Sequence, residues 1–399
     1  MPFELDDSPQ LKKGTGSFSV PRDAVQSLLE RNAAAWQIGA YLTLARYTNS
    51  ENKFCTASLK AIYKATGASD NKNGTASRIV DELLKMQCVQ KKHKRPFLIY
   101  RPEEWHKLTK EVIPDVPHEL HKIRFVLNQF DSEDRVWFPV SLIDGVGKFT
   151  QPLKALKQCG DVAARLLLLF YANNNMSEFG GVPPYPNAYR GFKLMHQKTT
   201  NGFDFWTASS VSHSAFHTLA LPVLGLKSFS KDEDEKESQW KLFWNALASL
   251  ENRGFINEII TVLDGPPDKQ DSRPIYILST RSKHSKPDTS LDAAPTNDRL
   301  FEKVTSSKCA DSLGRFRDSF PVITRAGIQS YVAGIYRLHF RINNKRNAEV
   351  SSSWLRIVNE FREHESNLKY LAGQFDVEID WLPDTPVDGI ITSDDGEEF

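Results

Sequence analysis

One stretch of the sequence combines two kinds of side chain that a polyanionic partner requires. Its first half carries polar groups that can bond base edges and phosphates, namely Asn71, Asn73, Thr75 and Arg78. Its second half carries an uninterrupted basic run of Lys91, Lys92, His93, Lys94 and Arg95. Asn and Arg form bidentate hydrogen bonds with adenine and guanine, and Lys and Arg neutralise phosphates. These residue types therefore predict recognition of a nucleic acid.

A helix and a hairpin are predicted to position these two groups. From Ala76 to Leu84 apolar residues recur at the i, i+3, i+4, i+7, i+8 spacing, which predicts a helix with one buried face. After Met86 two short apolar runs flank the basic run, which predicts a β-hairpin with a basic tip. A helix tip in the major groove with a hairpin on the phosphates is how a winged helix meets duplex DNA. The alternative is a solvated edge hairpin, because edge lysines also prevent unwanted strand pairing.

The segments before this stretch supply the remaining elements of such a domain. A mostly apolar helical region is predicted from Val20 to Asn49, and a second helix over residues 57–66 is closed by Gly67. The order helix, helix, turn, helix, hairpin predicts a first winged-helix domain over residues 20–101. A flexible arm, residues 1–19, is expected before it and a connector, residues 102–120, after it.

The second part of the chain resembles the first, segment by segment and in the same order. Trp137–Leu142 resembles Phe18–Pro21, Val162–Asn173 resembles Trp36–Asn49, Phe243–Ile256 resembles Ile79–Val89, and Arg273–Leu278 resembles Arg95–Tyr100. This predicts a duplication and a second winged-helix domain over residues 121–278, with an insertion over residues 176–226. An acidic run, Lys231–Glu237, and an acidic hairpin tip, Asp264–Asp271, make this copy a weaker DNA reader. A protein partner or a homodimer contact is the alternative role.

The C-terminal part is predicted to be helical. A polar linker, residues 279–298, leads to an all-helical region, residues 299–375, and an acidic tail, residues 376–399. Four basic residues near residues 327–344 are candidates for a phosphate or nucleic-acid contact, namely Arg337, Arg341, Lys345 and Arg346. The alternative for them is a solvated helix face. The predicted fold class is α+β and mainly helical, with two winged-helix (helix-turn-helix) domains followed by an all-helical C-terminal region.

Composition agrees with a nucleic-acid partner at one end only. The chain has 399 residues, 40% of them hydrophobic and 25% charged, which is ordinary for a globular protein of two or three domains. Its formal net charge of +1 hides 18 Lys and Arg against 11 Asp and Glu within residues 1–110, whereas residues 376–399 hold 9 acidic residues and no Lys or Arg. Four scattered cysteines and no long apolar run predict a cytoplasmic protein without a membrane segment.

The paired pattern resembles the tandem winged-helix replication initiators of plasmids and other mobile bacterial elements. The resemblance covers residues 20–278 and rests on VPRDAV, AWQIGAYLTLARYTN, ASRIVDELLKMQCV and RPFLIY with their later counterparts. It implies a sequence-specific double-stranded DNA-binding protein, an initiator or transcriptional regulator, that needs no cofactor. In the second copy, the acidic run Lys231–Glu237 precedes the helix that would contact DNA. Such a run is not expected in a copy that only binds DNA.

No catalytic motif supports an enzyme. Nucleotide-binding loops and the GxSxG and HExxH motifs are missing from the sequence. His213 and His217 have the spacing of a metal pair but lack a third ligand, so no metal is expected. Tyr331 and Tyr336 lie near arginines in the sequence, as the tyrosine of a strand-transfer enzyme would. Tyrosines of an amphipathic helix are more often part of the core, so a core position is predicted for both. The alternative to DNA binding is an adaptor that docks proteins through its winged-helix folds, with the insertion over residues 176–226 and the acidic tail, residues 376–399, as partner sites. In the insertion, Phe203, Phe205 and Trp206 are anchors or core. A DNA-processing enzyme is a third possibility.

Overall fold

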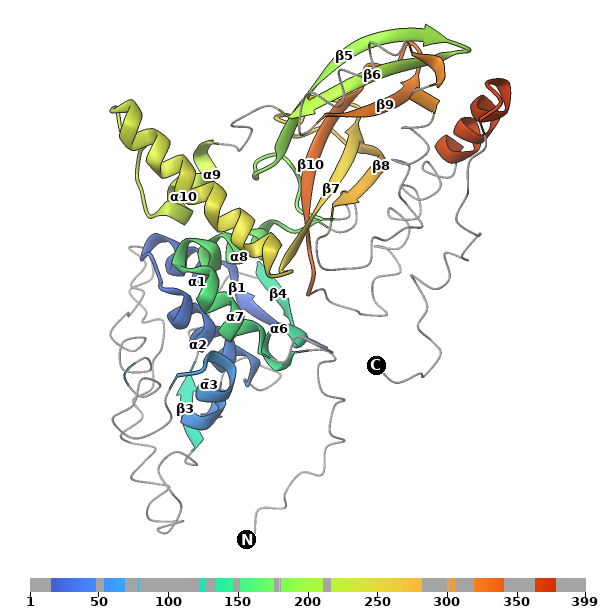
Figure 1. Ribbon diagram of the computed structural model, residues 1–399. Coiled ribbons are helices and arrows are strands. Elements are labelled where there is room, and N and C mark those ends of the chain that lie inside the picture. The colour runs from blue at the N-terminus through green and yellow to red at the C-terminus, as the bar shows by residue number, and fades with distance from the viewer. Residues whose placement is uncertain are drawn as a thin grey trace, which may run out of the picture. The chain divides into compact units, whose positions relative to one another are not determined.

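The computed structural model divides the chain into two compact units (Figure 1). Unit 1 comprises Met1–Ala172, Leu221–Arg253 and Phe340–Asn344, and unit 2 comprises Asn173–Ala220, Gly254–His339 and Lys345–Phe399. The residues that the structure describes are 16–47, 54–68, 78, 122–126, 134–145, 151–175, 179, 181–210, 217–281, 300–301, 303–305, 319–340 and 363–377. Because each unit uses separate stretches of sequence, neither is a contiguous segment.

Unit 1 is mainly helical, with two short ladders. Its described elements are β1 (Ser17–Pro21), α1 (Arg22–Glu30), α2 (Ala35–Arg46), β2 (Phe54–Ser58), α3 (Leu59–Thr66), β3 (Lys122–Val126), β4 (Arg135–Pro139), α6 (Ser141–Asp144), α7 (Pro152–Cys159), α8 (Asp161–Asn173) and α10 (Glu233–Asn252). Helix α9 (His217–Leu224) lies across the sequence boundary between the units. Helix α2 is buried along nearly its whole length and packs against α3 and α7, so it forms the centre of this unit.

Two segments that resemble each other in sequence pair directly in unit 1. Strands β1 and β4 form an antiparallel ladder in which Phe18 lies opposite Phe138 and Val20 lies opposite Val136. These four side chains are buried, and the rings of Phe18 and Phe138 stack with centroids 5.7 Å apart. The starts of the two predicted copies therefore share one ladder, and they lie in one unit rather than in separate domains.

A buried arginine joins distant parts of unit 1. Arg165 of α8 donates from Nε to the carbonyl oxygen of Val223 at 2.6 Å and from a terminal nitrogen to that of Ala33 at 3.3 Å. One turn earlier, the Asp161 carboxylate accepts from the backbone N–H of Ala35 at 2.8 Å, at the start of α2. Burial lowers the pKa of the Arg165 guanidinium, and Asp161 opposes that shift. Helix α8 thus holds the α1–α2 connection and the end of α9 at once.

Unit 2 is built on a six-stranded antiparallel sheet (Figure 1). Its strands are β5 (Arg190–Thr200), β6 (Phe203–Ser210), β7 (Ile256–Leu263), β8 (Pro274–Arg281), β9 (Ser319–Arg325) and β10 (Tyr331–Leu338), in the order β8-β7-β10-β5-β6-β9. Strand β10 pairs with β7 over its whole length and with β5 over three residues. It therefore joins two hairpins that are far apart in sequence.

A buried ion pair joins β7 and β5, the two strands on either side of β10, and β10 carries a glycine beside it. Glu258 of β7 is buried and pairs with Arg190 of β5 at 2.9 Å between Nε and Oε1. Gly334 of β10 lies between them, and a Cβ at this position would collide with the Glu258 carboxylate. A glycine inside a strand often marks such a close approach. The buried ion pair therefore requires Gly334.

Helical residues pack on the sheet of unit 2 and complete its core. Phe203, Phe205 and Ile323 of the sheet share one buried cluster with residues of 300–304 and of helix 363–374, the red helix in Figure 1. The helical contributions are Leu300, Phe301, Val304, Leu368, Leu371 and Ala372. These residues separate part of the sheet from water, which is why the C-terminal helix is amphipathic.

The first turn of that C-terminal helix contains a buried histidine. His364 is buried, and its neighbour Glu363 pairs with Arg325 of β9 at 2.5 Å. Burial lowers the pKa of the His364 imidazole to about 3, and the positive charge of Arg325 adds to the shift. A charged imidazole is thus incompatible with this packing.

The predicted fold class is wrong. The described residues contain a six-stranded antiparallel sheet, so the chain is not mainly helical, and residues 319–338 of the region expected to be all-helical form β9 and β10. The helix and hairpin expected to form a second winged helix are present as α10 and β7–β8 but belong to different units. The hairpin pairs with β10 instead of completing a domain around α10.

The error at β10 has a physical cause. Tyr331, Ile335 and Leu338 have helical spacing, which predicted an amphipathic helix. Strand β10 is a central strand, and Val332, Ala333, Ile335 and Tyr336 are all buried, so both of its faces are apolar. Such a strand has no alternation, and periodicity alone cannot distinguish it from a buried helix.

Replacing Arg165 tests its role in unit 1. We expect Arg165→Leu to lower the free energy of unfolding by about 2–4 kcal/mol, because two buried carbonyl groups would lose their charged donor. Urea unfolding followed by circular dichroism measures the change. Lys157→Leu, at an exposed position of α7, is the matched control and should change stability by less than about 0.5 kcal/mol. Equal stability of the two variants would contradict this role.

Acidification tests the environment of His364. The unfolded imidazole takes up a proton near its ordinary pKa of 6.5, whereas the folded one resists protonation down to about pH 3. Stability is therefore complete above pH 6.5 and falls as the pH is lowered toward 3, by about 1.4 kcal/mol per pH unit from this group. Urea unfolding between pH 7 and 4.5 should show a shallower pH dependence for His364→Leu than for the wild type. Parallel curves would contradict the assignment.

Candidate nucleic-acid interface

The structure describes one residue of the predicted helix tip and basic run. Arg78 is helical and exposed, as the predicted helix over residues 76–84 requires at that position. Asn71, Asn73, Thr75, Lys91, Lys92, His93, Lys94 and Arg95 lie outside the described residues. Their spatial relation to Arg78 therefore stays a prediction.

The helix before Arg78 ends with an exposed basic surface. Helix α3 ends at Thr66, and Gly67 follows with φ +70°, donating its N–H to the Tyr63 carbonyl at 2.7 Å. This left-handed residue is the glycine that the sequence predicted as the helix stop. The aliphatic chain of Lys154 from α7 lies against Gly67, with Cδ 3.2 Å from the position of a Cβ. A side chain at residue 67 would displace Lys154.

The charged groups around the end of α3 are available to a partner. Tyr63, Lys64 and Lys154 are exposed, and Lys64 lies in the last turn of α3. Within the part of the chain that the structure describes, Lys64 and Lys154 have no ion-pair partner. This region of unit 1 therefore presents uncompensated positive charge, which is what phosphate contact requires.

The second predicted basic cluster does not form on a helix. Arg337 lies in β10 and is half-buried, so the basic helix face expected at residues 337–346 is wrong at this position. Arg341, Lys345 and Arg346 lie outside the described residues. Tyr336 is fully buried, in agreement with the core interpretation of this tyrosine.

Metal ligation finds no support within the described residues. No three or more His, Cys, Asp or Glu side chains among them group closely enough to hold a metal ion. His217 is the first residue of α9, and His213 lies outside the described part of the chain.

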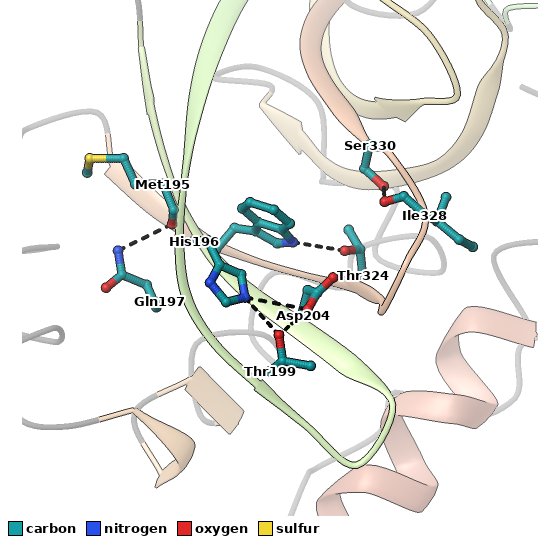
Figure 2. Close-up of polar contacts among 9 residues, drawn as sticks. Met195, His196, Gln197, Thr199, Asp204, Thr324, Ile328 and Ser330 are labelled. Atoms are coloured by element: carbon teal, nitrogen blue, oxygen red, sulfur yellow. Dashed lines mark hydrogen bonds and ion pairs between the residues drawn. The ribbon is translucent and has the colours of Figure 1, made fainter.

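A polar cluster that the sequence interpretation missed lies on the β5–β6 hairpin. His196, Thr199 and Asp204 turn toward one another, as Figure 2 shows. The His196 Nε2 atom lies 2.9 Å from the Thr199 hydroxyl, and that hydroxyl donates to Asp204 Oδ1 at 2.5 Å. The His196 Nε2 atom lies 3.5 Å from the same carboxylate oxygen. A β-bulge between His196 and Lys198 brings the three groups onto one face.

This cluster has the residue types of a hydrolytic triad without its geometry. In a triad the imidazole stands between the hydroxyl and the carboxylate and takes the hydroxyl proton. Here the Thr199 hydroxyl donates its hydrogen bond to Asp204, so His196 donates from Nε2 to the hydroxyl oxygen. The arrangement orients the imidazole but does not activate the threonine.

The aromatic ring beside this cluster is also held in place. The Trp206 indole N–H donates to the Thr324 hydroxyl of β9 at 2.9 Å, and its ring meets His196 edge to face with centroids 4.9 Å apart. Phe203 and Phe205 are buried in the core instead, so they are not partner anchors. Of the three aromatic candidates, Trp206 alone is left partly exposed.

The hairpin was identifiable from its turn. Asn201 and Gly202 have φ values of 49° and 78°, the left-handed pair that a tight type I′ turn demands. An Asn-Gly pair between β-branched and aromatic runs is a strong hairpin signal. Residues 176–226 were predicted only as an insertion, and this hairpin was not predicted within them.

The acidic run, Lys231–Glu237, leads into α10 and forms its first turn, where it has a local function. Asp232 caps the helix, and its Oδ1 accepts from the N–H groups of Asp234 and Glu235 at 3.0 and 3.1 Å. Carboxylates in the first turn also stabilise the helix dipole. The run is exposed and would repel phosphates. Weak DNA binding by this segment stays a prediction.

Comparison with known proteins leaves the family open. No protein-family model matches the chain, and neither the curated proteins nor the solved structures contain a match. Within the described residues, no helix combines the length and apolarity that crossing a bilayer demands.

Proposed function

We propose that the protein is a cytoplasmic, sequence-specific double-stranded DNA-binding protein that acts as a replication initiator or transcriptional regulator of a mobile genetic element. The observation that carries the proposal is the exposed positive charge of Lys64 and Lys154 at the end of α3, neither of which has an ion-pair partner among the described residues, together with the exposed helical Arg78. It agrees with the excess of 18 Lys and Arg over 11 Asp and Glu within residues 1–110.

The proposal divides the roles of these residues by their chemistry. Arg78, with Asn71, Asn73 and Thr75, approaches base edges in the major groove, where Arg can bond guanine with two hydrogen bonds. Lys91, Lys92, His93, Lys94 and Arg95 contact the phosphates of the backbone. Lys64 and Lys154 add phosphate contacts from the end of α3, and Tyr63 offers a hydroxyl to the same backbone. The protein acts without a cofactor and without catalysis.

Variants of Arg78 test base recognition. After selection of bound fragments from random DNA, we expect Arg78→Ala to reduce the preference for the selected site over random duplex by about 5- to 100-fold, the loss of one bidentate contact. Arg78→Lys keeps the charge and loses the bidentate geometry, so it should lose the preference while keeping the salt dependence. Fluorescence anisotropy at several salt concentrations measures both. Unchanged preference in Arg78→Ala would overturn this role.

The basic run is tested separately from base recognition. The double variant Lys92→Ala with Lys94→Ala should weaken binding to all duplexes about equally and reduce the slope of log affinity against log salt by about 2, because about 0.9 is lost per phosphate contact. Lys241→Ala in α10, whose ammonium pairs with Glu237, is the matched control and should change neither quantity. A double variant with the wild-type slope would contradict phosphate contact by this run.

An adaptor function is the second candidate, favoured by one observation. The start of α10 exposes Asp232, Glu233, Asp234, Glu235 and Glu237, an acidic surface suited to a basic protein partner. Recovery of a defined protein by the wild type after nuclease treatment, with loss upon neutralising these residues and no DNA shift at low salt, would favour the adaptor over the DNA reader.

A further inference from the structure

Helix α7 is anchored in unit 1 by one side and exposes two lysines on the other. Leu153 and Leu156 are buried, and the helix packs against α2, α3 and α10 (Figure 1). Lys154 and Lys157 are exposed, and neither has an ion-pair partner among the described residues. Residues three positions apart in a helix are neighbours on its surface. The two ammonium groups therefore project from the same side of α7.

Lys154 connects this side of α7 to the end of α3. Its aliphatic chain lies against Gly67, where a Cβ would come within 3.2 Å of Cδ and 3.3 Å of Cγ. The absence of a side chain at Gly67 thus serves the packing of the lysine as well as the helix stop. A lysine whose stem rests on the protein surface keeps its ammonium in water. Lys64, three residues before Gly67, is exposed as well, so positive charge continues from α3 onto α7.

Arg253 continues the positive charge at the other end of α7. It directly follows α10, is exposed, and donates from a terminal nitrogen to the Gln158 side-chain oxygen at 2.7 Å. The Cys159 sulfur lies 3.7 Å from the Ser249 carbonyl oxygen, so the ends of α7 and α10 are in contact. A guanidinium has five N–H donors. The bond to one neutral amide therefore orients Arg253 and leaves its charge uncompensated.

The acidic groups on the elements around α7 are few, and most are engaged or distant. No Asp or Glu occurs in α2, α3 or α7. Asp144 of α6 pairs with Arg46 at 3.5 Å, and the Asp161 carboxylate accepts from the backbone at the start of α2. Glu251 is half-buried in the last turn of α10. The other acidic residues of α10 lie in its first two turns, more than about 20 Å along the axis from its C-terminal end.

The composition of this side favours a phosphate backbone over a protein partner. Four cations, Lys64, Lys154, Lys157 and Arg253, define a basic row along α7, a helix about 12 Å long. Lys154, Lys157 and Gln158 are the exposed side chains of α7, and none of them is aromatic or aliphatic. Protein interfaces are enriched in aromatic side chains and depleted of lysine at their centre, whereas phosphates are bound by cations and polar groups alone. The basic row therefore fits the backbone of a nucleic acid.

We propose that α7 is a phosphate-binding helix that extends the duplex interface of unit 1 from the end of α3 to Arg253. Lys157 and Arg253 are the contacts that this adds, and Gln158 orients the guanidinium. The inference rests on the duplex binding proposed above and enlarges its surface from the end of α3 to α7 and the end of α10. Phosphate contacts carry no base information, so the added contacts strengthen binding to every duplex about equally.

Salt titrations of duplex binding, followed by fluorescence anisotropy, test the basic row. Each phosphate contact contributes about 0.9 to the slope of log affinity against log salt, so Lys157→Gln should reduce the slope by about 0.9 and Lys157→Gln with Arg253→Gln by about 1.8. The preference for the selected site over random duplex should stay at the wild-type value. Lys269→Gln is the matched control, because it removes an exposed lysine of unit 2 that likewise forms no ion pair with the described residues. It should leave the slope unchanged.

A charge placed beside Arg253 tests the same contact without removing the arginine. Gln158→Glu is close in size to the wild type and puts a carboxylate where the amide oxygen lies 2.7 Å from the guanidinium. The resulting ion pair should withdraw Arg253 from the phosphates and reduce the slope by about as much as Arg253→Gln does. Gln158→Met removes the hydrogen bond without adding charge, so it should keep the wild-type slope.

The outcomes separate this inference from the duplex function itself. A wild-type protein that binds no duplex at low salt would overturn both. Duplex binding that persists with an unchanged slope in Lys157→Gln with Arg253→Gln would overturn the α7 contact alone, and so would a wild-type slope in Gln158→Glu. Lys157, Gln158 and Arg253 are exposed, so these substitutions spare the core, and circular dichroism checks that each variant is folded.

Discussion

The structure of unit 1 depends on the hydrogen bonds that a buried arginine makes to two distant carbonyl groups. A guanidinium in the protein interior is tolerated only where acceptors surround it, and Arg165 finds them at Val223 and Ala33. The carbonyl groups at the end of a helix carry negative partial charge, so the last turn of α9 is a suitable partner. Nearby, Gly225 has φ +77° and packs so closely on the Asn32 side chain that no Cβ would fit. The chain is thereby required to return to unit 1 after residues 173–220.

This return explains why the units interleave. Residues 221–253 supply α10 to unit 1, and its Phe243, Leu247 and Leu250 are buried there. The hairpin β7–β8 that follows α10 lies in unit 2 and pairs with β10. A helix and the hairpin after it are close in sequence, yet their apolar faces are buried in different cores. Local pattern therefore identified the elements but not the unit to which each belongs.

The sequence was most informative where one residue determines the local backbone. Gly67 marked the end of α3 because only a residue tolerant of positive φ can follow the helix there, and the structure confirms it. The helix predicted over residues 57–66 starts later, at Leu59, because Phe54–Ser58 pairs with β3 some 70 residues away. That pairing leaves no trace in the spacing of nearby residues. The same limit applies to β10, whose partners come from residues 190–192 and 256–263.

Candidate sites were predictable to the extent that they are local. Arg78 could be predicted at an exposed helical position because the apolar stripe beside it defines the buried face. The cluster of His196, Thr199 and Asp204 could not, because it needs a bulge and a turn to bring three residues onto one face. Phe205 and Trp206, adjacent in sequence, differ in fate because alternate residues of a strand face opposite sides. Phe205 is buried in the core, and Trp206 remains partly exposed.

The near-neutral charge of the chain is compatible with the duplex proposed as its ligand because phosphate contact depends on local charge. The Debye length is about 8 Å at physiological salt, so a distant carboxylate hardly weakens an exposed lysine. Some carboxylates are also engaged locally, since Asp232 caps α10 and Asp204 accepts from Thr199. The positive charges of Lys64 and Lys154 lack such partners among the described residues. The end of α3 in unit 1 can therefore present a basic surface although the chain as a whole is close to neutral.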